Sequence, residues 1–415
     1  MLGQNPRVRC AVVCTLALLI GGVAHADDRT PVTLEAALAA AGKAPSAQIG
    51  RYDLAAAEAN IDAATAWPLT GLHVGTNRLT AKLIVGASIP LPIFGTIGVA
   101  RRVAAAEAEV VRSEAELALR DLRHRVVVAW IDLLRAGDDV TALQVAAKQA
   151  AELETIARGR LDAGTGADVD VTVANAARAR ADVAVAAALR EQDAASAELA
   201  GLLGWNPAQP LRADGAPVIA PAAALPALQA RLAGHPETQA AQRRVVAAQA
   251  AVDAALVQRW PGLALEGELD YDDKTQMGNN AWDKTDAHVG LALDLPIFAR
   301  IGDKARAARA TEAAQRMRLA ALEAELGGRL VAAYQRWQAA SERLAAMERD
   351  VIPAQEKAAT LSMQAYREGA RDLSSAVLAE RDLASARAEL NDARAQAALA
   401  YADLAVAIGE DIHAK

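Results

Sequence analysis

Cysteine is almost missing from this chain of 415 residues, and its scarcity excludes two classes of site. Only Cys10 and Cys14 are present, and both fall within residues 1–26, which we predict to be a cleaved signal peptide. The mature protein would then contain no disulfide and no cysteine-based metal site. Neither cysteine follows the predicted cleavage point, so we do not expect lipid attachment there.

Long apolar runs are also scarce. Arg7 and Arg9 precede an apolar run at 11–23, and Ala24-His25-Ala26 is a signal-peptidase site of the A-x-A form. This run is too short to span a bilayer, and no later segment offers about 20 consecutive apolar residues. A protein exported without a helical anchor ends in the periplasm, the outer membrane or the medium.

Aromatic residues and excess positive charge are lacking as well. Aromatics make up 3% of the chain, too few for a conventional large core, whereas 53% hydrophobic residues rich in alanine suit closely packed helices. The net charge of −7 provides no basic surface, so nucleic acid is not an expected partner.

Catalytic motifs are missing from the sequence. It contains no Walker A loop, G-x-S-x-G elbow, H-E-x-x-H pair or dinucleotide fingerprint. The histidines of the mature chain are scattered without metal-ligand spacing: His73, His124, His235, His288 and His413. We therefore expect no catalytic residue, cofactor or metal site, and do not expect an enzyme.

The chain instead contains a two-fold internal repeat. Leu91-Pro92-Ile93-Phe94, followed by Ile97-Gly98, returns as Leu295-Pro296-Ile297-Phe298, followed by Ile301-Gly302, at an offset of 295 − 91 = 204. Each copy lies between an alternating apolar segment and a long alanine-rich helical segment. Neither half could bury its apolar faces alone.

The helical segments predict two long antiparallel hairpins. From about residue 99 to Gly164 the pattern is helical, and at 1.5 Å per residue this would span roughly 100 Å. Each run ends in a glycine turn, with Gly164 and Gly166 in the first copy and Gly369 in the second. Pro353 predicts a kink or break.

Domain boundaries follow from the repeat. After the signal peptide we expect a first repeat at 27–205, a linker at 206–226, a second repeat at 227–409 and a tail at 410–415. Each repeat would consist of a helix, a β-hairpin and a long helical hairpin. The hairpins are expected at about 67–91 and 260–297, and the long helical hairpins at about 99–204 and 303–409.

The alternating segments predict strands with one apolar and one polar face. In 262–273 the odd positions are mostly apolar and the even positions mostly acidic. Such ten-residue alternation is typical of membrane barrel strands, with the polar face toward the lumen. The expected lumen residues are Glu266, Glu268, Asp270 and Asp294, as a solvated wall rather than a binding site. The alternative is a pair of hairpins capping a soluble helical domain.

Four strands cannot close a membrane barrel, which needs at least about eight. If the strands lie in a membrane, the open sheet edges must pair between copies of the chain.

These features together resemble the TolC-type outer-membrane efflux protein family. The second turn, 365–372 running on to 377–379, resembles that family's Y-x-x-G-x-x…D-V-L-x-A turn, and the first, Gly164 through 170–171 to Ala174, is similar to its counterpart. The resemblance covers nearly the whole mature chain. The chain length and the Leu-Pro-Ile-Phe junctions are most similar to the heavy-metal, CzcC-like branch.

The resemblance implies a mainly α protein with a small β part. It implies a homotrimer in which the strands form one twelve-stranded β-barrel in outer-membrane lipid and the helices form a periplasmic α-barrel. Such a protein is a passive exit duct for substrates, metal cations among them. It docks through a periplasmic adaptor onto an inner-membrane pump, here expected to be of the RND type.

The turns at the far end of the helices would form the periplasmic aperture. In a trimer Asp168, Asp170 and Asp372 would become acidic rings, and Arg371 could pair with an aspartate of a neighbour to hold the aperture shut. The alternative for these aspartates is ordinary helix capping. Tyr366 is either a constriction residue, as the resemblance suggests, or a packing residue.

The competing hypothesis is a soluble periplasmic coiled coil with a structural or adaptor-like role. An adaptor would need additional domains rich in short strands, whereas this chain shows two hairpins.

Overall fold

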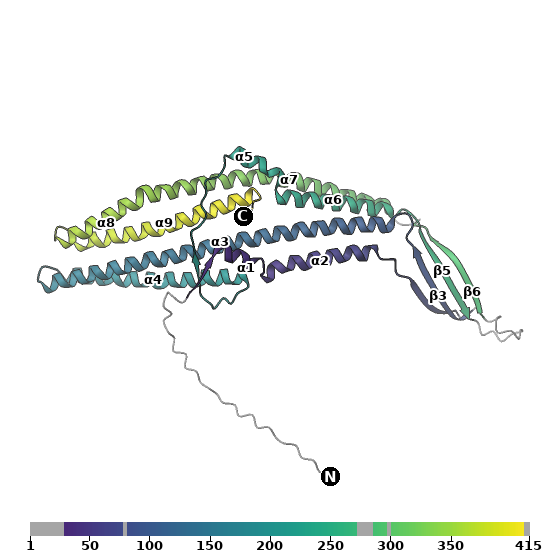
Figure 1. Ribbon diagram of the computed structural model, residues 1–415, viewed down its shortest axis with the longest axis horizontal. Coiled ribbons are helices and arrows are strands. Elements are labelled where there is room, and N and C mark those ends of the chain that lie inside the picture. The colour runs from purple at the N-terminus through teal and green to yellow at the C-terminus, as the bar shows by residue number, and fades with distance from the viewer. Residues whose placement is uncertain (1–28, 78–80, 272–284, 297–299, 411–415) are drawn as a thin grey trace, which may run out of the picture.

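The computed structural model describes residues 29–77, 81–271, 285–296 and 300–410. Within these residues the molecule is elongated, with a small sheet at one end and helical turns at the other (Figure 1). The predicted signal peptide and the predicted tail beyond residue 410 lie outside the described residues. Among the helices described, none combines the length and apolarity that a membrane span requires.

The first repeat contains three short elements, β1, α1 and β4, and five longer ones, which are the helices α2, α3 and α4 and the strands β2 and β3. In chain order they are β1 (Thr30–Thr33), α1 (Leu34–Ala41), α2 (Pro45–Thr65), β2 (Gly71–Asn77), β3 (Ala81–Leu91), α3 (Thr96–Asp162), α4 (Asp168–Leu203) and β4 (Leu211–Asp214).

The second repeat follows the same order. It contains α5 (Leu225–Gln229), a 3₁₀ turn (Ala230–Gly234), α6 (Pro236–Val257), β5 (Gly262–Tyr271), β6 (Thr285–Asp294), α7 (Ile301–Ala346), a π-helical turn (Met347–Val351), α8 (Ile352–Arg367) and α9 (Leu373–Ala407). The prediction of a mainly α fold with long helical hairpins, four hairpin strands and a two-fold repeat is confirmed.

The four hairpin strands form one antiparallel sheet in the order β2-β3-β5-β6. Its register places Val74, Val85 and Leu269 in one row and Gly86 opposite Glu268 in the next. Alternating faces are therefore apolar and polar across the sheet, as the sequence predicts.

The helices form a wall of four rods in the same order as the strands. The long α3 packs against α2 and α4 on one side and against α6 and α9 on the other. α7 packs against α6 and α9, and α8 packs against α9. The order across the wall is therefore α2 with α4, then α3, then α6 with α9, then α7 with α8. Each rod continues into one strand of the sheet.

Two of these rods consist of helices that meet end to end. α4 ends at Gly204 (φ 70°), where an added Cβ would lie 2.9 Å from Cδ of Pro45, the first residue of α2. α9 ends at Ala407 and is followed by Ile408 and Gly409 (φ 75°), where the Cβ would lie 2.5 Å from Cδ of Pro236, the first residue of α6. Glycine supplies the left-handed C-terminal turn and proline suits the first helical position, so both joints use the same chemistry.

The His235 imidazole bridges α9 and α6 at the second joint. His235, 3% exposed, accepts a hydrogen bond at Nδ1 from the backbone N–H of Glu237, so it caps α6. Its Nε2 lies 3.2 Å from the carbonyl oxygen of Val406 in the last turn of α9. The side chain thus contacts both helix ends.

Each repeat has an equivalent core next to its joint. In the first, Val126 and Leu199 are buried with Trp130, whose Nε1 donates to the carbonyl of Val32 at 2.8 Å. In the second, Leu330 and Leu404 are buried at the corresponding positions. Trp130 therefore fixes β1 onto α3.

Two segments differ from a simple reading of the sequence. The stretch 206–226, expected as a linker, contains β4, which pairs in parallel with β1 over four residues. β4 also packs against α3 and α4, and the backbone N–H of Leu211 donates to the hydroxyl of Ser196 in α4 at 2.7 Å. Pro353, where we expect a kink or break, is the second residue of α8, and a π-helical turn ends just before that helix. Proline has no N–H to complete the α-helical hydrogen-bond ladder at this point.

Candidate functional site

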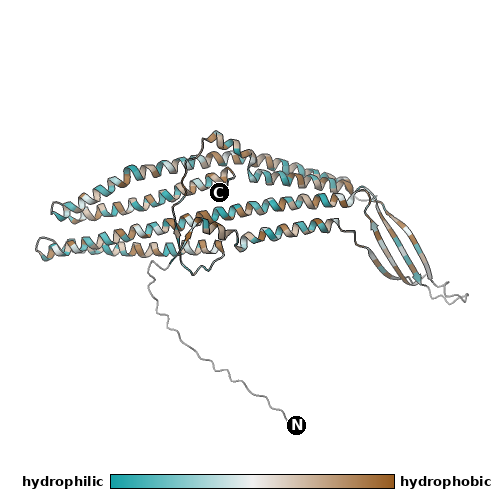
Figure 2. Ribbon diagram, viewed as in Figure 1, coloured by the Kyte–Doolittle hydropathy of each residue, from teal (hydrophilic) through white to brown (hydrophobic). Residues whose placement is uncertain are grey.

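The sheet presents a continuous apolar surface on one face. Val289, Leu291 and Leu269 are 82%, 67% and 53% exposed. The other face carries Glu266 and Glu268 of β5, and hydrophobic and hydrophilic residues lie side by side along the strands (Figure 2). A sheet with this much exposed apolar side chain needs a nonaqueous environment or a partner.

The predicted lumen residues share one face. Glu266, Glu268 and Asp270 alternate along β5, and Asp294 of β6 is the register partner of Gly262 on the same face. The prediction that these four side chains line one surface agrees with the register. Whether that surface is a lumen depends on assembly.

The strand-to-helix junction is tight and aromatic. Pro92 follows the end of β3, and Phe94 (φ 61°) and Gly95 (φ 74°) are both left-handed before α3 begins. The Phe94 ring stacks on Trp260, with centroids 5.2 Å apart and planes 11° apart. Stacking across the two repeats offsets the backbone strain at Phe94.

The second junction is described only in part. Pro296 follows β6, whereas Phe298 lies outside the described residues. The Trp260 ring is also approached by the Arg259 guanidinium, 5.3 Å from its centroid. Aromatic and basic side chains thus gather where the sheet meets the helices, as at a membrane–water interface.

The two helical turns at the opposite end have the same hydrogen bonds. Gly164 and Gly369, both at φ 74°, donate to Leu161 and Tyr366 at 2.9 and 3.0 Å. In each turn the next residue donates back to the carbonyl five positions earlier, which completes a Schellman motif. At Gly166 an added Cβ would lie 2.8 Å from the backbone nitrogen of Leu161, so this turn also requires glycine.

Arg160 joins the two turns within one chain. Its Nη1 donates to the carbonyl oxygen of Tyr366 at 2.6 Å, and its guanidinium lies 5.0 Å from the centroid of the Tyr366 ring. Beneath this contact, Leu153 and Ala157 of α3 pack against Met363 of α8. The residues predicted to form the aperture did not include Arg160, which lies in the last turn of α3.

Tyr366 is buried in this conformation, at 1% exposure. Burial raises the pKa of its hydroxyl, the nearby Asp170 raises it further, and Arg160 opposes both. Among the described residues its hydroxyl has no hydrogen-bond partner. The ring therefore packs between two turns of the same chain here, and its role as a constriction in an assembly stays a prediction.

The other predicted aperture residues lie at the surface of this end. Asp168 and Asp170 are in the first turn of α4, whose N-cap position is Ala167, and Asp372 is the N-cap residue of α9. Neither helix is capped by a side-chain hydrogen bond to its backbone N–H groups. Arg371 is exposed and forms no ion pair within the described part of the chain. The Asp372 carboxylate accepts a hydrogen bond from the Ser375 hydroxyl at 2.5 Å.

Further ion pairs tie the rods together near this end. Arg178 of α4 donates to Glu154 of α3 at 2.9 Å, which with Arg158 holds the pKa of Glu154 below its usual range. Arg367 pairs with Glu152. Burial raises the pKa of the Glu380 carboxyl.

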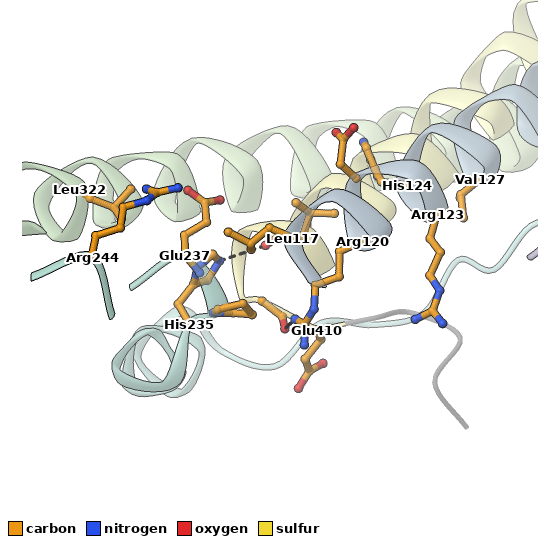
Figure 3. A pocket seen from close by; sticks show the side chains of 14 residues that line it. Leu117, Arg120, Arg123, His124, Val127, His235, Glu237, Arg244, Leu322 and Glu410 are labelled. Carbon is orange, nitrogen blue, oxygen red and sulfur yellow. Dashed lines mark hydrogen bonds between the residues drawn. The ribbon is translucent and has the colours of Figure 1, made fainter. Parts of the chain in front are cut away.

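A cavity of about 400 Å³ lies where α3 passes the joint between α9 and α6 (Figure 3). Its cationic groups already have partners. Arg120 donates to the carbonyl of Gly409 at 2.9 Å, Arg244 contacts Glu114 at 2.9 Å, and His124 contacts Asp403 at 3.2 Å. We therefore assign this cavity no ligand. Across the described residues, no three metal-ligating side chains lie close enough to enclose an ion.

Replacing Tyr366 with alanine is expected to loosen both turns. A buried aromatic removed from a packed cluster costs about 3–5 kcal/mol, and the Arg160 guanidinium loses the face it lies against. Hydrogen exchange read by mass spectrometry should show faster exchange in both 157–170 and 363–376.

Two variants make this test specific. Tyr366→Phe should exchange at the rate of the parent, because the hydroxyl has no hydrogen-bond partner among the described residues. Tyr52→Ala should leave exchange in both segments unchanged, because Tyr52 is 74% exposed on α2. Equal protection in Tyr366→Ala and the parent would contradict the tie between the turns.

Comparison with known proteins assigns the chain to a family. A sequence profile described as outer membrane efflux protein matches residues 45–205 and 227–410, which together are most of the chain. The chain belongs to the outer membrane efflux protein family. The two matched segments coincide with the two structural repeats, and the gap between them with the β4 connection.

Solved members of this fold are similar over nearly their whole length. The outer-membrane channel OprN has a TM-score of 0.74 at 21% identity, covering 91% of this chain and 90% of its own. CusC has a TM-score of 0.75 at 15% identity, covering 91% and 92%. VceC of Vibrio cholerae has a TM-score of 0.73 at 17% identity, covering 92% and 97%. Among curated protein sequences none matches the chain. At these identities the structures establish the fold of this efflux-family chain.

Proposed function

We propose that the chain is the outer-membrane channel subunit of a tripartite efflux system. This proposal rests on one observation: the four strands, in the order β2-β3-β5-β6, and the four helical rods are arranged side by side in the same order. A β-barrel built from these sheets and a tunnel built from these helical walls would therefore need the same number of subunits. Three chains would supply twelve strands and twelve rods, enough for a membrane barrel above a helical tunnel.

The duct would be passive and its energy would come from elsewhere. We infer export by the cleaved signal peptide without lipidation, insertion of the apolar sheet face into outer-membrane lipid, and a periplasmic helical tunnel. A periplasmic adaptor would dock the tunnel onto an inner-membrane pump of the RND type. Metal cations, as carried by the heavy-metal branch, are the proposed cargo class.

Assembly tests this proposal directly. The purified protein should be a detergent-requiring trimer from the outer-membrane fraction whose gel mobility changes on heating. It should also form discrete conductance steps in planar bilayers. A soluble periplasmic monomer would support the competing coiled-coil function and would overturn the channel.

Removing Asp168 and Asp170 together is expected to weaken cation binding at the aperture. In a trimer the double substitution to alanine removes two of the three acidic rings and leaves that of Asp372, so block of the channel by a trivalent cation added on the periplasmic side should weaken by about tenfold or more. The measurement is single-channel conductance against cation concentration. Asp62→Ala on α2, an exposed aspartate far from the turns, is the matched control. Unchanged block in the double variant would remove the acidic rings from the mechanism.

Arg371 has a separate proposed role. It would pair with an aspartate of a neighbouring subunit and hold the resting aperture shut.

A further inference from the structure

The two repeats meet inside the chain through an ion pair that crosses from one helix to another. Arg244 of α6 donates from Nη2 and Nε to the Glu114 carboxylate of α3, at 2.9 and 3.1 Å. Neither residue has an oppositely charged residue three or four positions away on its own helix. The pair is therefore a contact between the repeats, on the side of α3 that α6 covers.

The two outer edges of the wall lack such a contact. α2 packs against α3 at one edge, and α7 packs against α6 and α9 at the other, so each edge helix leaves one side open. The internal repeat relates these edges to the covered contact, because α2 corresponds to α6 and α7 corresponds to α3. In a ring of copies, α7 of one copy would meet α2 of the next as α3 meets α6 within the chain.

The repeat also identifies the residues that would meet across the edges. α3 and α7 are related by the offset of 204 between the Leu-Pro-Ile-Phe junctions, so Glu114 corresponds to Arg318. α2 and α6 both begin at a proline that lies against the glycine of a joint, and 236 − 45 = 191 is their offset. Arg244 therefore corresponds to Asp53.

Apolar positions near this pair are buried inside the chain and exposed at the edges. Ala240 on α6 is 1% exposed, whereas Ile49, its counterpart on α2, is 61% exposed. Ser113 on α3 is 4% exposed, whereas Met317, its counterpart on α7, is 68% exposed. The open edges thus carry the larger apolar side chains, which a neighbouring copy would cover.

The charges at the open edges are opposite to each other and reversed relative to the covered pair. Asp53 and Arg318 are both exposed, and neither forms an ion pair or a side-chain hydrogen bond with another described residue. Neither has an oppositely charged residue three or four positions away on its own helix. The two edges are therefore complementary, whereas two α2 edges or two α7 edges would bring like charges together.

We propose that α2 of one copy docks on α7 of the next, with Asp53 paired to Arg318 and Ile49 packed beside Met317. The inference rests on the proposed channel, which requires the wall to close from several copies. The reversed charges also determine which helices meet, because α2 in the place of α6 would bring Asp53 against Glu114. Arginine on α6 and glutamate on α3 join the repeats within a chain, and aspartate on α2 and arginine on α7 join the chains.

Charge reversal tests the pair in the assembled protein. Asp53→Arg or Arg318→Asp alone would place like charges at all three contacts of a trimer. The ratio of heat-modifiable trimer to monomer in detergent should then fall by about tenfold or more. The double variant restores opposite charges, so its trimer should return. Glu107→Arg is the matched control, because Glu107 is an exposed carboxylate on α3, which has helices of its own chain on both sides.

Cross-linking gives a second measurement, which does not depend on the stability of the trimer. Cys10 and Cys14 both lie in the predicted signal peptide, so the mature parent should have no thiol to react. Asp53→Cys combined with Arg318→Cys should allow a short bis-maleimide to join chains into covalent dimers and trimers. Either cysteine alone should give neither product, because each edge meets only the opposite edge.

The two measurements separate this interface from the channel. Conducting trimers that tolerate both single charge reversals, without cross-linking of the double cysteine variant, would overturn the pairing and leave the channel intact. Recovery in the double reversal, with cross-linking, in a protein that never conducts would overturn the channel and leave the interface.

Discussion

Replacing Val289 with arginine is expected to prevent membrane assembly. Val289 lies in the middle of β6 on the apolar face and is 82% exposed in the single chain. A lipid-facing arginine near the bilayer midplane costs about 2–4 kcal/mol, and a trimer carries three copies. The heat-modifiable trimer should disappear from the outer-membrane fraction on gels, with the chain recovered as degraded or aggregated material.

The adjacent residue provides the control. Gly290 points to the opposite face, and an added Cβ there would meet no atom within 4 Å. Gly290→Arg should assemble and change ion selectivity, because its charge faces water. If Val289→Arg assembles as well as Gly290→Arg, the apolar face does not contact lipid.

Replacing Trp130 with alanine should give the largest loss of stability in the helical part. The side chain is 1% exposed, packs in the core of the first repeat and donates to the carbonyl of Val32. Its removal should lower the free energy of unfolding by about 3–5 kcal/mol, and the Val32 carbonyl loses its hydrogen-bond donor. Circular dichroism of the detergent-solubilised trimer should show a melting temperature lower by several degrees.

Two further variants separate packing from hydrogen bonding. Trp130→Phe retains most of the apolar volume and should recover part of the loss. Tyr334→Ala, at the equivalent position of the second repeat, should cost less because Tyr334 is only partly buried. A larger loss at Tyr334 than at Trp130 would show that the second core, and not the first, limits stability.

The sequence predicted the elements whose evidence is local. Alternation along 262–271 is a period-two pattern, so it identified β5 and both of its faces before any partner strand was known. Gly164 and Gly369 identified the turns, because a left-handed helix terminus strongly favours glycine. The repeat then predicted the order of elements in the second half from the first.

Features that depend on distant segments were not predictable in the same way. Arg160 and Tyr366 are 206 positions apart, and nothing in either local pattern indicates the other. Likewise, only the strand register reveals that His73 and His288 lie at the same level of the sheet. β4 was missed because four residues in a proline- and alanine-rich stretch carry no periodic signal.

The end-to-end joints give the wall two kinds of mechanical path. α3 is a single helix of 67 residues, so its backbone carries force without interruption from the turns to the sheet. Between α4 and α2, and between α9 and α6, the backbone helix is interrupted and a glycine lies against a proline, with the His235 imidazole contacting both helix ends in the second case. When the turns rotate, the helices can therefore shift relative to each other at these two joints, and less of the movement reaches the sheet. In the proposed channel, we expect the turns to move in this way while the strands keep their register.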